Sequence, residues 1–533
     1  MICVSDSEMN IILDVISHHA SDCDVLVFGS RYKWNSEDSS DLDLAFVLSN
    51  GDKLGLKRIG DLEFAFAESD LPFRVDVLDY HAISPEFRSV IDAGNEVIYR
   101  GKVNGGGLLR VKPEWKTCKL GDIYDFSSGL SKNAKEFGFG FPFLSFKTIF
   151  RNYFVPDNIV DLANTNEDEQ RCCSINVGDI FLTRTSETMD ELGMSCVALK
   201  NYPRATFNGF TKRLRPKIPD TIYPKYAAYF FRSHLFRQQI DKMAIMTTGA
   251  SLNNDMLARM EILVPPQREQ KIIGDTLYAL DDKIENNVAI NRYLEQMAQA
   301  IFKSWFVDFE PFGGTMPDDW RDGTMSDIIS TTLGGDWGKD MPTDNNTQEV
   351  YCIRGADIPD VNAGNKGKMP IRYILPKNYS AKQLTVGDVV IEISGGSPTQ
   401  STGRCALITQ SLLDRYDRGM VCTNFCRAVK PFTECSTFVY FYWKYLYAKN
   451  VMFAYENGTT GIKNLDIAGF LETERIVIPS IDVIGNFTEA VGVFIDSIFA
   501  NGLENERLAT IRDALLPRLM SGELAVAGGG EGG

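Results

Sequence analysis

Several features that would place a chain in a particular class of protein are missing from this 533-residue sequence. Its eleven cysteines include no CxxC pair, and neither Cys172-Cys173 nor Cys422 with Cys426 has the His or Cys partners that a zinc site needs. The start, MICVSDSEMN, has no basic segment and no apolar segment, and no run of about 18 apolar residues follows. We therefore predict reduced thiols, no membrane span and a cytoplasmic location.

Positive charge is also scarce, since 55 Lys and Arg stand against 71 Asp and Glu, giving a net charge of −16. Such a deficit would normally argue against nucleic-acid binding, but the distribution of charge matters more than its sum. Acidic residues outnumber basic ones more than twofold in residues 1–100, whereas residues 113–268 are about balanced. Nucleic-acid binding by the later part of the chain is therefore not excluded.

One pattern occurs twice, in residues 273–305 and 487–519. In both copies, seam residues follow one another at alternating steps of four and three, which is the spacing of a heptad repeat. The copies match position by position at a constant offset, so we predict two long helices that pack against each other. The alternative is two unrelated surface helices on separate cores.

Two asparagines fall at the same seam positions in both copies, Asn287 and Asn291 in the first and Asn501 and Asn505 in the second. If a pseudo-two-fold axis relates the copies, the helices run antiparallel, and Asn287 faces Asn505 while Asn291 faces Asn501. Buried seam asparagines cost stability but fix the register, because a slip would set an amide against an apolar side chain.

Short motifs recur in the same order ahead of each heptad copy. They are a Trp, a VGD turn before an apolar strand, a TTG turn, and an apolar strand that ends in Pro. Their positions are Trp115 and Trp320, 177–179 and 386–388, 247–249 and 459–461, and 262–266 and 476–480. Each set mixes strand and helix signals over about 150 residues, so we expect two globular α/β domains that each end in a long helix.

The first hundred residues predict a helix at 9–18 and strands at 24–28, 42–48 and 73–78. Asp41 and Asp43 are two residues apart and share a strand face, and Asp76 on another strand can join them. Converging carboxylates repel one another unless a cation lies between them, and oxygen ligands of this kind suit Mg²⁺. The sequence therefore predicts a metal site, with an acidic surface loop as the alternative.

These residues, with Gly29-Ser30-Arg31 before them, resemble the GSR…SDxDL pattern of the minimal nucleotidyltransferases. The resemblance implies that Asp41, Asp43 and Asp76 are catalytic and hold Mg²⁺ ions on a nucleoside triphosphate. It also implies that Gly29, Ser30 and Arg31 bind the nucleotide phosphates. One departure is the bulky segment at residues 32–35, where the small members usually carry a Gly, and this segment is expected to narrow the nucleotide pocket.

Residues 112–519 resemble the specificity subunit of type I restriction-modification enzymes. The resemblance rests on the TTG turns with Asn253 and Asn464 nearby, the helix start at 265–270, and the stretch at 280–312. It implies recognition of an asymmetric, two-part site in double-stranded DNA, in anti-phage defence, without methyl transfer or cleavage by this chain. Two methyltransferase subunits and the restriction (translocase and nuclease) subunits would bind S-adenosylmethionine and ATP.

The expected architecture is multidomain α/β, with the two long helices packed as an antiparallel coiled coil of pseudo-two-fold symmetry. We expect a nucleotidyltransferase-like domain at 1–100, a Gly-rich linker at 101–111, a target recognition domain at 112–266, a long helix at 267–312, a second recognition domain at 313–480, a second long helix at 481–522 and a flexible tail at 523–533.

Candidate DNA-binding residues are Lys, Arg and small polar side chains in and near the repeated motifs, because such groups contact phosphates and base edges. Lys212, Arg213 and Arg215 alternate on a predicted strand and could face a phosphate backbone. The other candidates are Lys147, Arg184, Thr248, Ser251 and Asn253 in the first domain, and Arg354, Arg404, Thr460, Lys463 and Asn464 in the second. The aromatic segments at 226–236 and 438–447 have helical spacing and are expected to be core.

Two other functions remain open. The chain could be a nucleotidyltransferase that modifies a protein or RNA and is targeted by the repeat region. It could also be a purely structural array, which absent or salt-independent DNA binding would favour.

Overall fold

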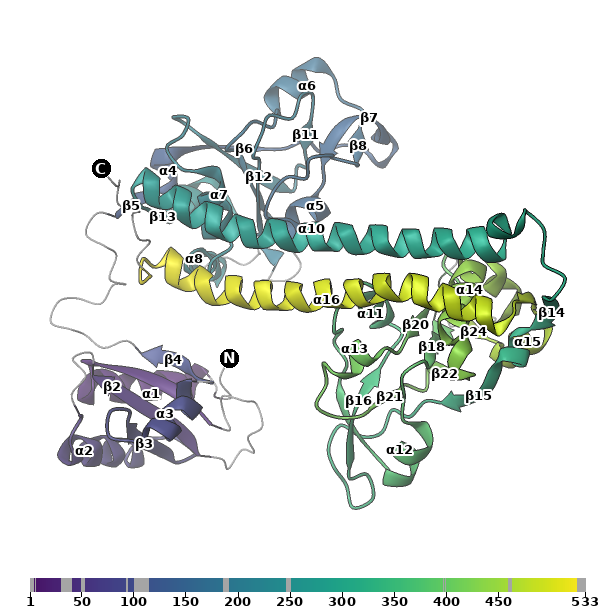
Figure 1. Cartoon of the computed structure of the whole chain (residues 1–533). Coiled ribbons are helices and arrows are strands. Elements are labelled where there is room, and N and C mark those ends of the chain that lie inside the picture. Colours follow the sequence, from purple (N-terminus) through teal and green to yellow (C-terminus); the bar gives the residue numbers. More distant parts are fainter. Residues whose placement is uncertain are drawn as a thin grey trace, which may run out of the picture. The chain divides into compact units, whose positions relative to one another are not determined.

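The computed structural model describes residues 4, 6–29, 41–48, 53–92, 94–99, 115–185, 191–245, 251–395, 397, 399–458 and 463–524. The chain divides into two compact units, Met1–Val111 and Lys112–Gly533 (Figure 1). The predicted Gly-rich linker lies outside the described residues.

The first unit contains one four-stranded sheet in the order β3-β2-β1-β4, in which β2 and β3 are parallel and β1 is antiparallel to β2 and β4. Its core forms because alternate residues of β1, such as Val25 and Val27, point to the face that α1 covers with Ile12 and Ile16. The elements are α1 (Asp6–His19), β1 (Cys23–Phe28), β2 (Leu42–Leu48), α2 (Leu56–Ala67), β3 (Val75–Asp79), α3 (Pro85–Asp92) and β4 (Glu96–Tyr99).

The first α/β domain of the second unit runs from β5 to β13 and contains the sheets β10-β9-β12-β6, β11-β7-β8 and β13-β5. Its elements are β5 (Lys116–Lys119), α4 (Leu120–Ile123), β6 (Tyr124–Ser128), β7 (Phe137–Leu144), α5 (Phe146–Arg151), β8 (Leu162–Ala163), α6 (Glu167–Cys172), β9 (Ile180–Thr183), β10 (Ser195–Val197), β11 (Thr206–Phe207), β12 (Thr211–Pro216), α7 (Pro224–Phe230), α8 (His234–Ile245), α9 (Asn254–Arg259) and β13 (Glu261–Val264).

The second α/β domain runs from β14 to β25. Its elements are β14 (Arg321–Thr324), β15 (Ile329–Gly334), β16 (Gln348–Ile353), α11 (Ile358–Asn362), β17 (Ile371–Ile374), α12 (Pro376–Lys382), β18 (Val389–Glu392), β19 (Ser394–Gly395), β20 (Cys405–Leu407), α13 (Gln410–Leu413), β21 (Met420–Cys422), β22 (Cys426–Pro431), α14 (Ser436–Ala448), β23 (Glu456–Asn457), β24 (Lys463–Leu465), α15 (Ile467–Thr473) and β25 (Arg475–Ile478).

The two α/β domains share their strand order. The sheet β15-β22-β18-β20 of the second domain follows the same path as β6-β12-β9-β10 of the first, and β14-β25 corresponds to β5-β13. Both aromatic segments are core, as predicted, since Tyr226, Phe230, Phe438 and Trp443 are fully buried. The repeated sequence motifs therefore correspond to a repeated fold.

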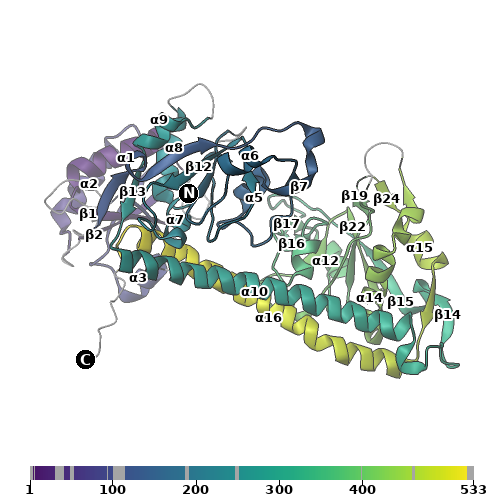
Figure 2. The ribbon, with the colours of Figure 1, turned by 90° about the horizontal axis from the view of Figure 1, so that it is seen from above.

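Two helices of 40 residues each, α10 (Gln267–Phe306) and α16 (Ile481–Met520), lie side by side and run in opposite directions (Figures 1 and 2). We call them the helix pair. The first α/β domain contacts α10 through Tyr229, whose hydroxyl donates to Asp281 at 2.6 Å. The second packs Phe438 of α14 against Phe302 and Phe306 near the other end of α10.

Helix α10 ends six residues earlier than the predicted boundary at 312. The chain leaves helical geometry after Phe306, and Phe309 has a left-handed φ of 54° before a 3-10 turn at Glu310–Phe312. Phe309 and Phe312 then pack against Trp320 at the start of the second α/β domain.

At the C-terminal end of α16, the ring of Trp115 lies beside Gly522, where an added Cβ would sit 3.4 Å from the ring.

Helix α16 is the one helix in the described part of the chain that is long and apolar enough to cross a membrane by length and composition, with a hydropathy of 1.4. The sequence prediction considered only uninterrupted apolar runs, which α16 lacks. Its residues Phe487 and Val491 are buried in the core that also contains Phe302 and Phe438. A core helix passes the same test, so this finding is weak evidence for a span.

Candidate functional site

The candidate nucleotide site lies at the end of β1. Gly29 has a φ of +80°, and a Cβ at this position would clash with the carboxylate of Asp43 on β2. In the sheet, Asp43 pairs with Phe28 on β1 and with Asp76 on β3. Only glycine fits this turn, because both its backbone angle and its contact with Asp43 exclude a side chain.

The carboxylates of this site influence one another. Burial raises the pKa of Asp43, and the negative charges of Asp76 and Asp41 raise it further. Asp76 Oδ1 also forms an exposed ion pair with Arg74 Nε at 3.0 Å. A cation placed among these acids would therefore favour the ionised form of Asp43.

The predicted metal-binding geometry is only partly present. Within the residues that the structure describes, no three His, Cys, Asp or Glu side chains are grouped closely enough to hold a metal ion. Asp41, Asp43 and Asp76 are electrostatic neighbours that supply the oxygen donors Mg²⁺ prefers. Ser30 and Arg31, and the bulky segment at 32–35, lie outside the described residues.

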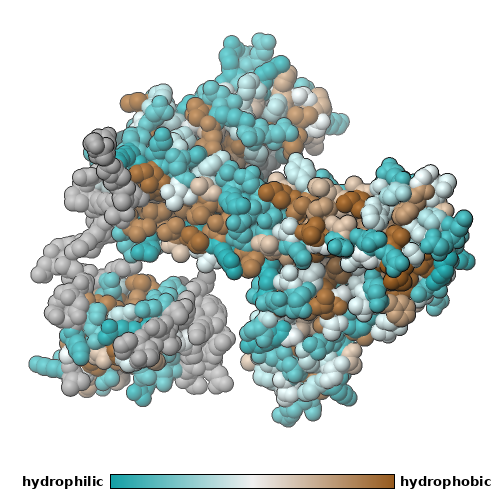
Figure 3. All heavy atoms as spheres, in the orientation of Figure 1, coloured by the Kyte–Doolittle hydropathy of each residue, from teal (hydrophilic) through white to brown (hydrophobic). Residues whose placement is uncertain are grey.

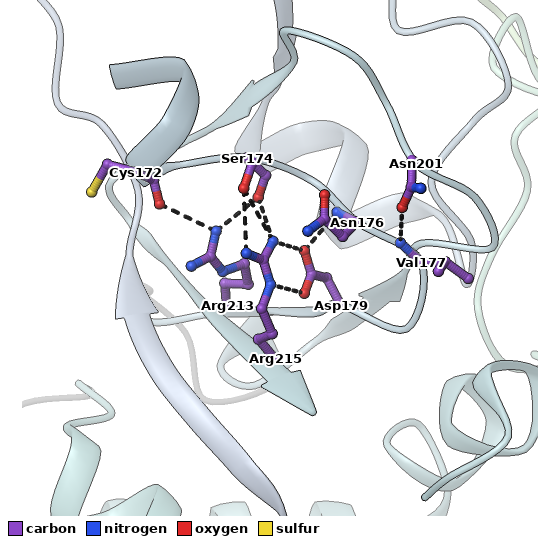
Figure 4. Close-up of polar contacts among 8 residues, drawn as sticks. All are labelled: Cys172, Ser174, Asn176, Val177, Asp179, Asn201, Arg213 and Arg215. Carbon is purple, nitrogen blue, oxygen red and sulfur yellow. Dashed lines mark hydrogen bonds and ion pairs between the residues drawn. The ribbon is translucent and has the colours of Figure 1, made fainter. Parts of the chain in front are cut away.

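In the basic cluster on β12, Arg213 and Arg215 bind groups of their own domain (Figure 4). Lys212 and Arg213 are only 8% and 7% exposed. Arg213 donates to the backbone oxygens of Cys172 and Ser174, at 3.3 and 2.7 Å. Arg215 donates to Asp179 Oδ1 and Oδ2, at 2.7 and 2.6 Å. Arg213 and Arg215 therefore hold the segment from Cys172 to Asp179 inside the domain.

The ion pair of Arg215 explains the repeated VGD motif. Asp179, whose side chain is fully buried, also accepts from the Asn176 backbone N–H at 2.7 Å, and its bond to Arg215 is the main cause that raises the pKa of that guanidinium. In the second domain, Asp388 accepts from the Thr385 backbone N–H at 2.8 Å and from Lys430 Nζ at 2.7 Å. The motif is thus a structural anchor in both domains.

Lys212 differs from its neighbours because, among the described residues, its ammonium contacts only neutral groups. Its Nζ donates to Ser128 Oγ at 3.0 Å and to Asn254 Oδ1 at 2.7 Å. Burial lowers the pKa of Lys212, and the positive charge of Arg184 lowers it further. Arg184 and Lys212 are therefore two neighbouring cations.

The other first-domain candidates are dispersed. Lys147 is exposed on α5, while Ser251 forms a β-bridge with Thr185. The Asn253 side chain accepts from the Met256 backbone N–H at 2.9 Å and so caps α9. Thr248 lies outside the described residues.

Second-domain candidates are mostly bound by acids of the same domain. The contacts are Arg354 with Asp357 at 2.9 Å, Arg404 with Glu392 at 2.6 Å, and Lys463 with Glu456 at 2.7 Å. The Ser394 hydroxyl donates to Asn464 Oδ1. Thr460 lies outside the described residues.

Sequence reasoning missed two residues of the second domain. Asp466 caps α15 by accepting from the Gly469 backbone N–H at 3.0 Å, so Asp466, and not Asn464, corresponds to Asn253. Arg427 on β22 occupies the position of Lys212 on β12. Each strand ends in its anchoring cation followed by Pro, Arg215-Pro216 in β12 and Lys430-Pro431 in β22, and Lys212 and Arg427 each lie four residues before that Pro. Aligning the two strands by these Pro residues would have revealed Arg427.

The seam asparagines lie opposite one another across the helix pair. Asn287 Nδ2 donates to Asn505 Oδ1 at 2.9 Å and to Glu504 Oε2 at 2.6 Å. Asn501 Nδ2 donates to Asn291 Oδ1 at 2.8 Å. Asn291 Nδ2 in turn donates to the backbone oxygens of Ile498 at 3.0 Å and Ala363 at 3.1 Å. The second layer therefore also ties the second α/β domain to the helix pair.

Comparisons with known proteins match both units. Residues 112–296 match the family model described as type I restriction modification DNA specificity domain, and residues 12–103 match that of polymerase beta nucleotidyltransferases. The chain is 25% identical over 452 residues to the type I restriction enzyme MjaIX specificity subunit of Methanocaldococcus jannaschii, covering 78% of this chain and 95% of that protein. It is also 25% identical over 473 residues to the HindI specificity subunit of Haemophilus influenzae, covering 77% and 100%.

The N-terminal region matches a different kind of relative. It is 38% identical over 88 residues to the probable protein adenylyltransferase MntA of Haemophilus influenzae, covering 16% of this chain and 75% of that protein. Among solved structures, a type I restriction-modification S subunit from M. genitalium aligns with a TM-score of 0.47 and 16% identity, covering 78% of this chain and 97% of that one.

Proposed function

Because the chain belongs to the family of type I restriction-modification specificity subunits and carries an N-terminal nucleotidyltransferase domain, we propose that it reads an asymmetric DNA site in two parts. The observation that carries this proposal is the pair of α/β domains with the same strand order but different side chains. Each domain reads one half-site. Side chains that differ between the two domains would give the two half-sites different sequences.

We further propose that the helix pair is an antiparallel coiled coil with pseudo-two-fold symmetry that sets the distance between the half-sites. The asparagine contacts at its centre support this register. Ile290, Tyr293 and Met297 are exposed on α10 at spacings of three and four residues, and apolar side chains follow the helices in Figure 3. Such a stripe suits the docking of helices from two methyltransferase subunits, to which restriction subunits are added.

The test is to express the chain with the methyltransferase subunits of its own system and to map methylated bases in the host genome. We expect one motif with two specified parts and an unspecified spacer. Exchanging residues 112–266 for those of a relative should change one part and leave the other intact. Methylation without a motif, or a motif without a spacer, would contradict the proposal.

For the first unit we propose Mg²⁺-dependent transfer of a nucleotidyl group from a nucleoside triphosphate to a hydroxyl group, with release of pyrophosphate. Asp41, Asp43 and Asp76 would hold the metal, and Gly29, Ser30 and Arg31 the phosphates. The tight packing of Gly29 on Asp43 and the raised pKa of Asp43 support this assignment. The acceptor is a partner protein or an RNA.

This second activity is tested by incubating the full chain with Mg²⁺, each α-³²P-labelled nucleoside triphosphate and the co-purified subunits. Label should appear on one protein or RNA acceptor and disappear in the double variant Asp43→Asn/Asp76→Asn. If the folded chain transfers label from none of the four nucleotides to any acceptor, nucleotidyl transfer by this unit is refuted.

A further inference from the structure

Cations in the two α/β domains differ in whether an acid already neutralises them. A cation held by a carboxylate must break that ion pair before it can contact a phosphate, so it is a poor candidate for DNA binding. The candidates bound in this way are Arg215 by Asp179, Arg354 by Asp357, Arg404 by Glu392 and Lys463 by Glu456. Arg213 meets backbone oxygens instead and is buried.

Lys212 and Arg184 pass this test. In the described part of the first domain, neither forms an ion pair with a carboxylate. Arg184 directly follows β9, and its backbone N–H donates to Phe210, two residues before Lys212, at 2.9 Å, so the two cations lie at the same end of neighbouring strands. The Lys212 ammonium has three N–H groups, of which Ser128 and Asn254 accept two. Two adjacent cations without an anion are unfavourable unless an anion binds between them.

The second domain has an unneutralised cation at the same place in its sheet. Lys212 pairs with Leu182 on β9 and Ser128 on β6, and Arg427 pairs with Ile391 on β18 and Gly334 on β15. Arg427 Nε is buried without a hydrogen-bond partner, and no ion pair of Arg427 is found among the described residues. At the same strand position in both domains there is therefore one cation for which the described residues provide no acid.

The Lys212 ammonium lies next to exposed polar groups. The Lys212 ammonium reaches Asn254, which is exposed at the start of α9, and Ser251 and Asn253 precede it. Asn464, which bonds to Ser394, is exposed in the corresponding region of the second domain. The ammonium group is thus at the edge of the domain even though the stem of Lys212 is buried.

We infer that Lys212 with Arg184 in the first domain, and Arg427 in the second, bind backbone phosphates of duplex DNA. This inference rests on the proposed function and assigns the contacts that hold each domain on the duplex. The equivalent sites position the two domains in the same way, while side chains that differ between the domains read the bases. The acid-bound arginines keep their structural roles.

The test measures binding of the purified complex of chain and methyltransferase subunits to a fluorescein-labelled duplex of random sequence, over a series of NaCl concentrations. Each phosphate contact contributes about 0.9 to the slope of log K against log salt concentration. We expect Lys212→Met, Arg184→Met and Arg427→Met each to lower the slope by about 0.9 and to weaken binding roughly tenfold. Lys212→Arg should keep the parent slope.

Two matched controls each remove one positive charge elsewhere. Lys200→Met breaks the exposed pair with Asp157 in the first domain, and Lys377→Met removes an exposed charge from α12 in the second. Both should keep the parent slope. A uniform loss in all five Met variants would mean that net charge alone matters, which would overturn the inference.

The outcomes separate the inference from the function on which it rests. A parent complex that binds no duplex refutes the proposed function and the inference with it. A parent that binds, with folded variants that keep its slope, refutes the inference alone. If Lys212→Met fails to fold, the salt slopes of Arg184→Met and Arg427→Met test the inference instead. Both side chains are partly exposed, so their replacement is expected to leave the fold intact.

Discussion

At the scale of single residues, replacing Asp43 tests whether the packing of the first unit disfavours its ionised carboxylate. Its pKa is raised in the fold by burial and by the charges of Asp76 and Asp41, so folding disfavours its ionised form. This penalty is absent below the unfolded-state pKa and is fully present above the folded-state pKa. Asp43→Asn should therefore raise the melting temperature of the first unit at pH 7 by roughly 2–5 °C.

The measurement is differential scanning calorimetry of the full chain as a function of pH. The difference between Asp43→Asn and the parent should shrink as the pH falls through the raised pKa of Asp43. A variant that is less stable than the parent at neutral pH would show that Asp43 is held by favourable contacts instead.

Arg215 provides a residue-scale test of the repeated anchor. Arg215→Met would leave the fully buried Asp179 carboxylate without its cation, which should destabilise the second unit by about 3–5 kcal/mol. Arg215→Lys should recover part of this loss, because Lys430 performs the same role beside Asp388. Urea unfolding checks both values, and equal stability of the Met variant and the parent would contradict the anchor.

The same residues show where sequence reasoning ends. The spacing of Lys212, Arg213 and Arg215 correctly indicated a strand, but alternation alone cannot tell which face is buried. Asp179, the partner of Arg215, lies in the turn before β9 and becomes visible as a partner only when the sheet is formed. Arg427 was missed because its strand carries fewer charges than β12.

At the scale of elements, heptad spacing predicted both long helices and their facing asparagines, since a seam is a local pattern that repeats over many turns. The end of α10 was not predictable in the same way. It depends on Phe309 and Phe312 packing against Trp320, a contact made by the next domain. Strands β1, β2 and β3 of the first unit were also predicted within two residues, because their apolar runs are short and well bounded, whereas β4 (Glu96–Tyr99) was not predicted.

The asparagine layer makes an element-scale prediction about the helix pair. Asn287→Leu should destabilise the second unit by about 1–3 kcal/mol, because it leaves the amide of Asn505 buried without its partner. Adding Asn505→Leu should recover most of that loss, since two apolar residues then face each other. A double variant as unstable as the sum of the two single variants would show that the amides do not act as a pair.

The length of the helix pair makes another prediction. The second α/β domain is tied to its centre through Asn291 and through Arg415, which pairs with Glu506 at 2.6 Å. An insertion must therefore lie on the first domain's side, between Asp281 and Asn287 in α10 and between Glu506 and Arg512 in α16. Inserting four residues in each helix lengthens the helix pair between the two α/β domains by about 6 Å.

This insertion should lengthen the DNA spacer by about two base pairs at ~3.4 Å each, with both half-sites unchanged. Methylome mapping of the insertion variant gives the result directly. An unchanged spacer would show that the helix pair does not set the distance between the domains.

At the scale of the whole molecule, the division into two compact units predicts that they are separable. Deleting residues 1–105 should leave the methylated sequence unchanged, because the described first unit has its own sheet and core. The same deletion should abolish nucleotide labelling. Loss of the DNA motif in a truncated chain that still assembles would show that the first unit takes part in recognition.

The proximity of Trp115 and Gly522 has a consequence for chain connectivity. The second unit begins and ends at the same end of the helix pair, and Gly313 and Gly314, both with positive φ, lie between α10 and the second α/β domain. The backbone therefore traces nearly a closed ring. A short peptide joining residue 524 to residue 115, with new termini cut at Gly313 and Gly314, would give a circular permutant with the second domain first. The permutant should keep every contact described for this unit, because the packing of the folded domains does not depend on which of them comes first in the chain.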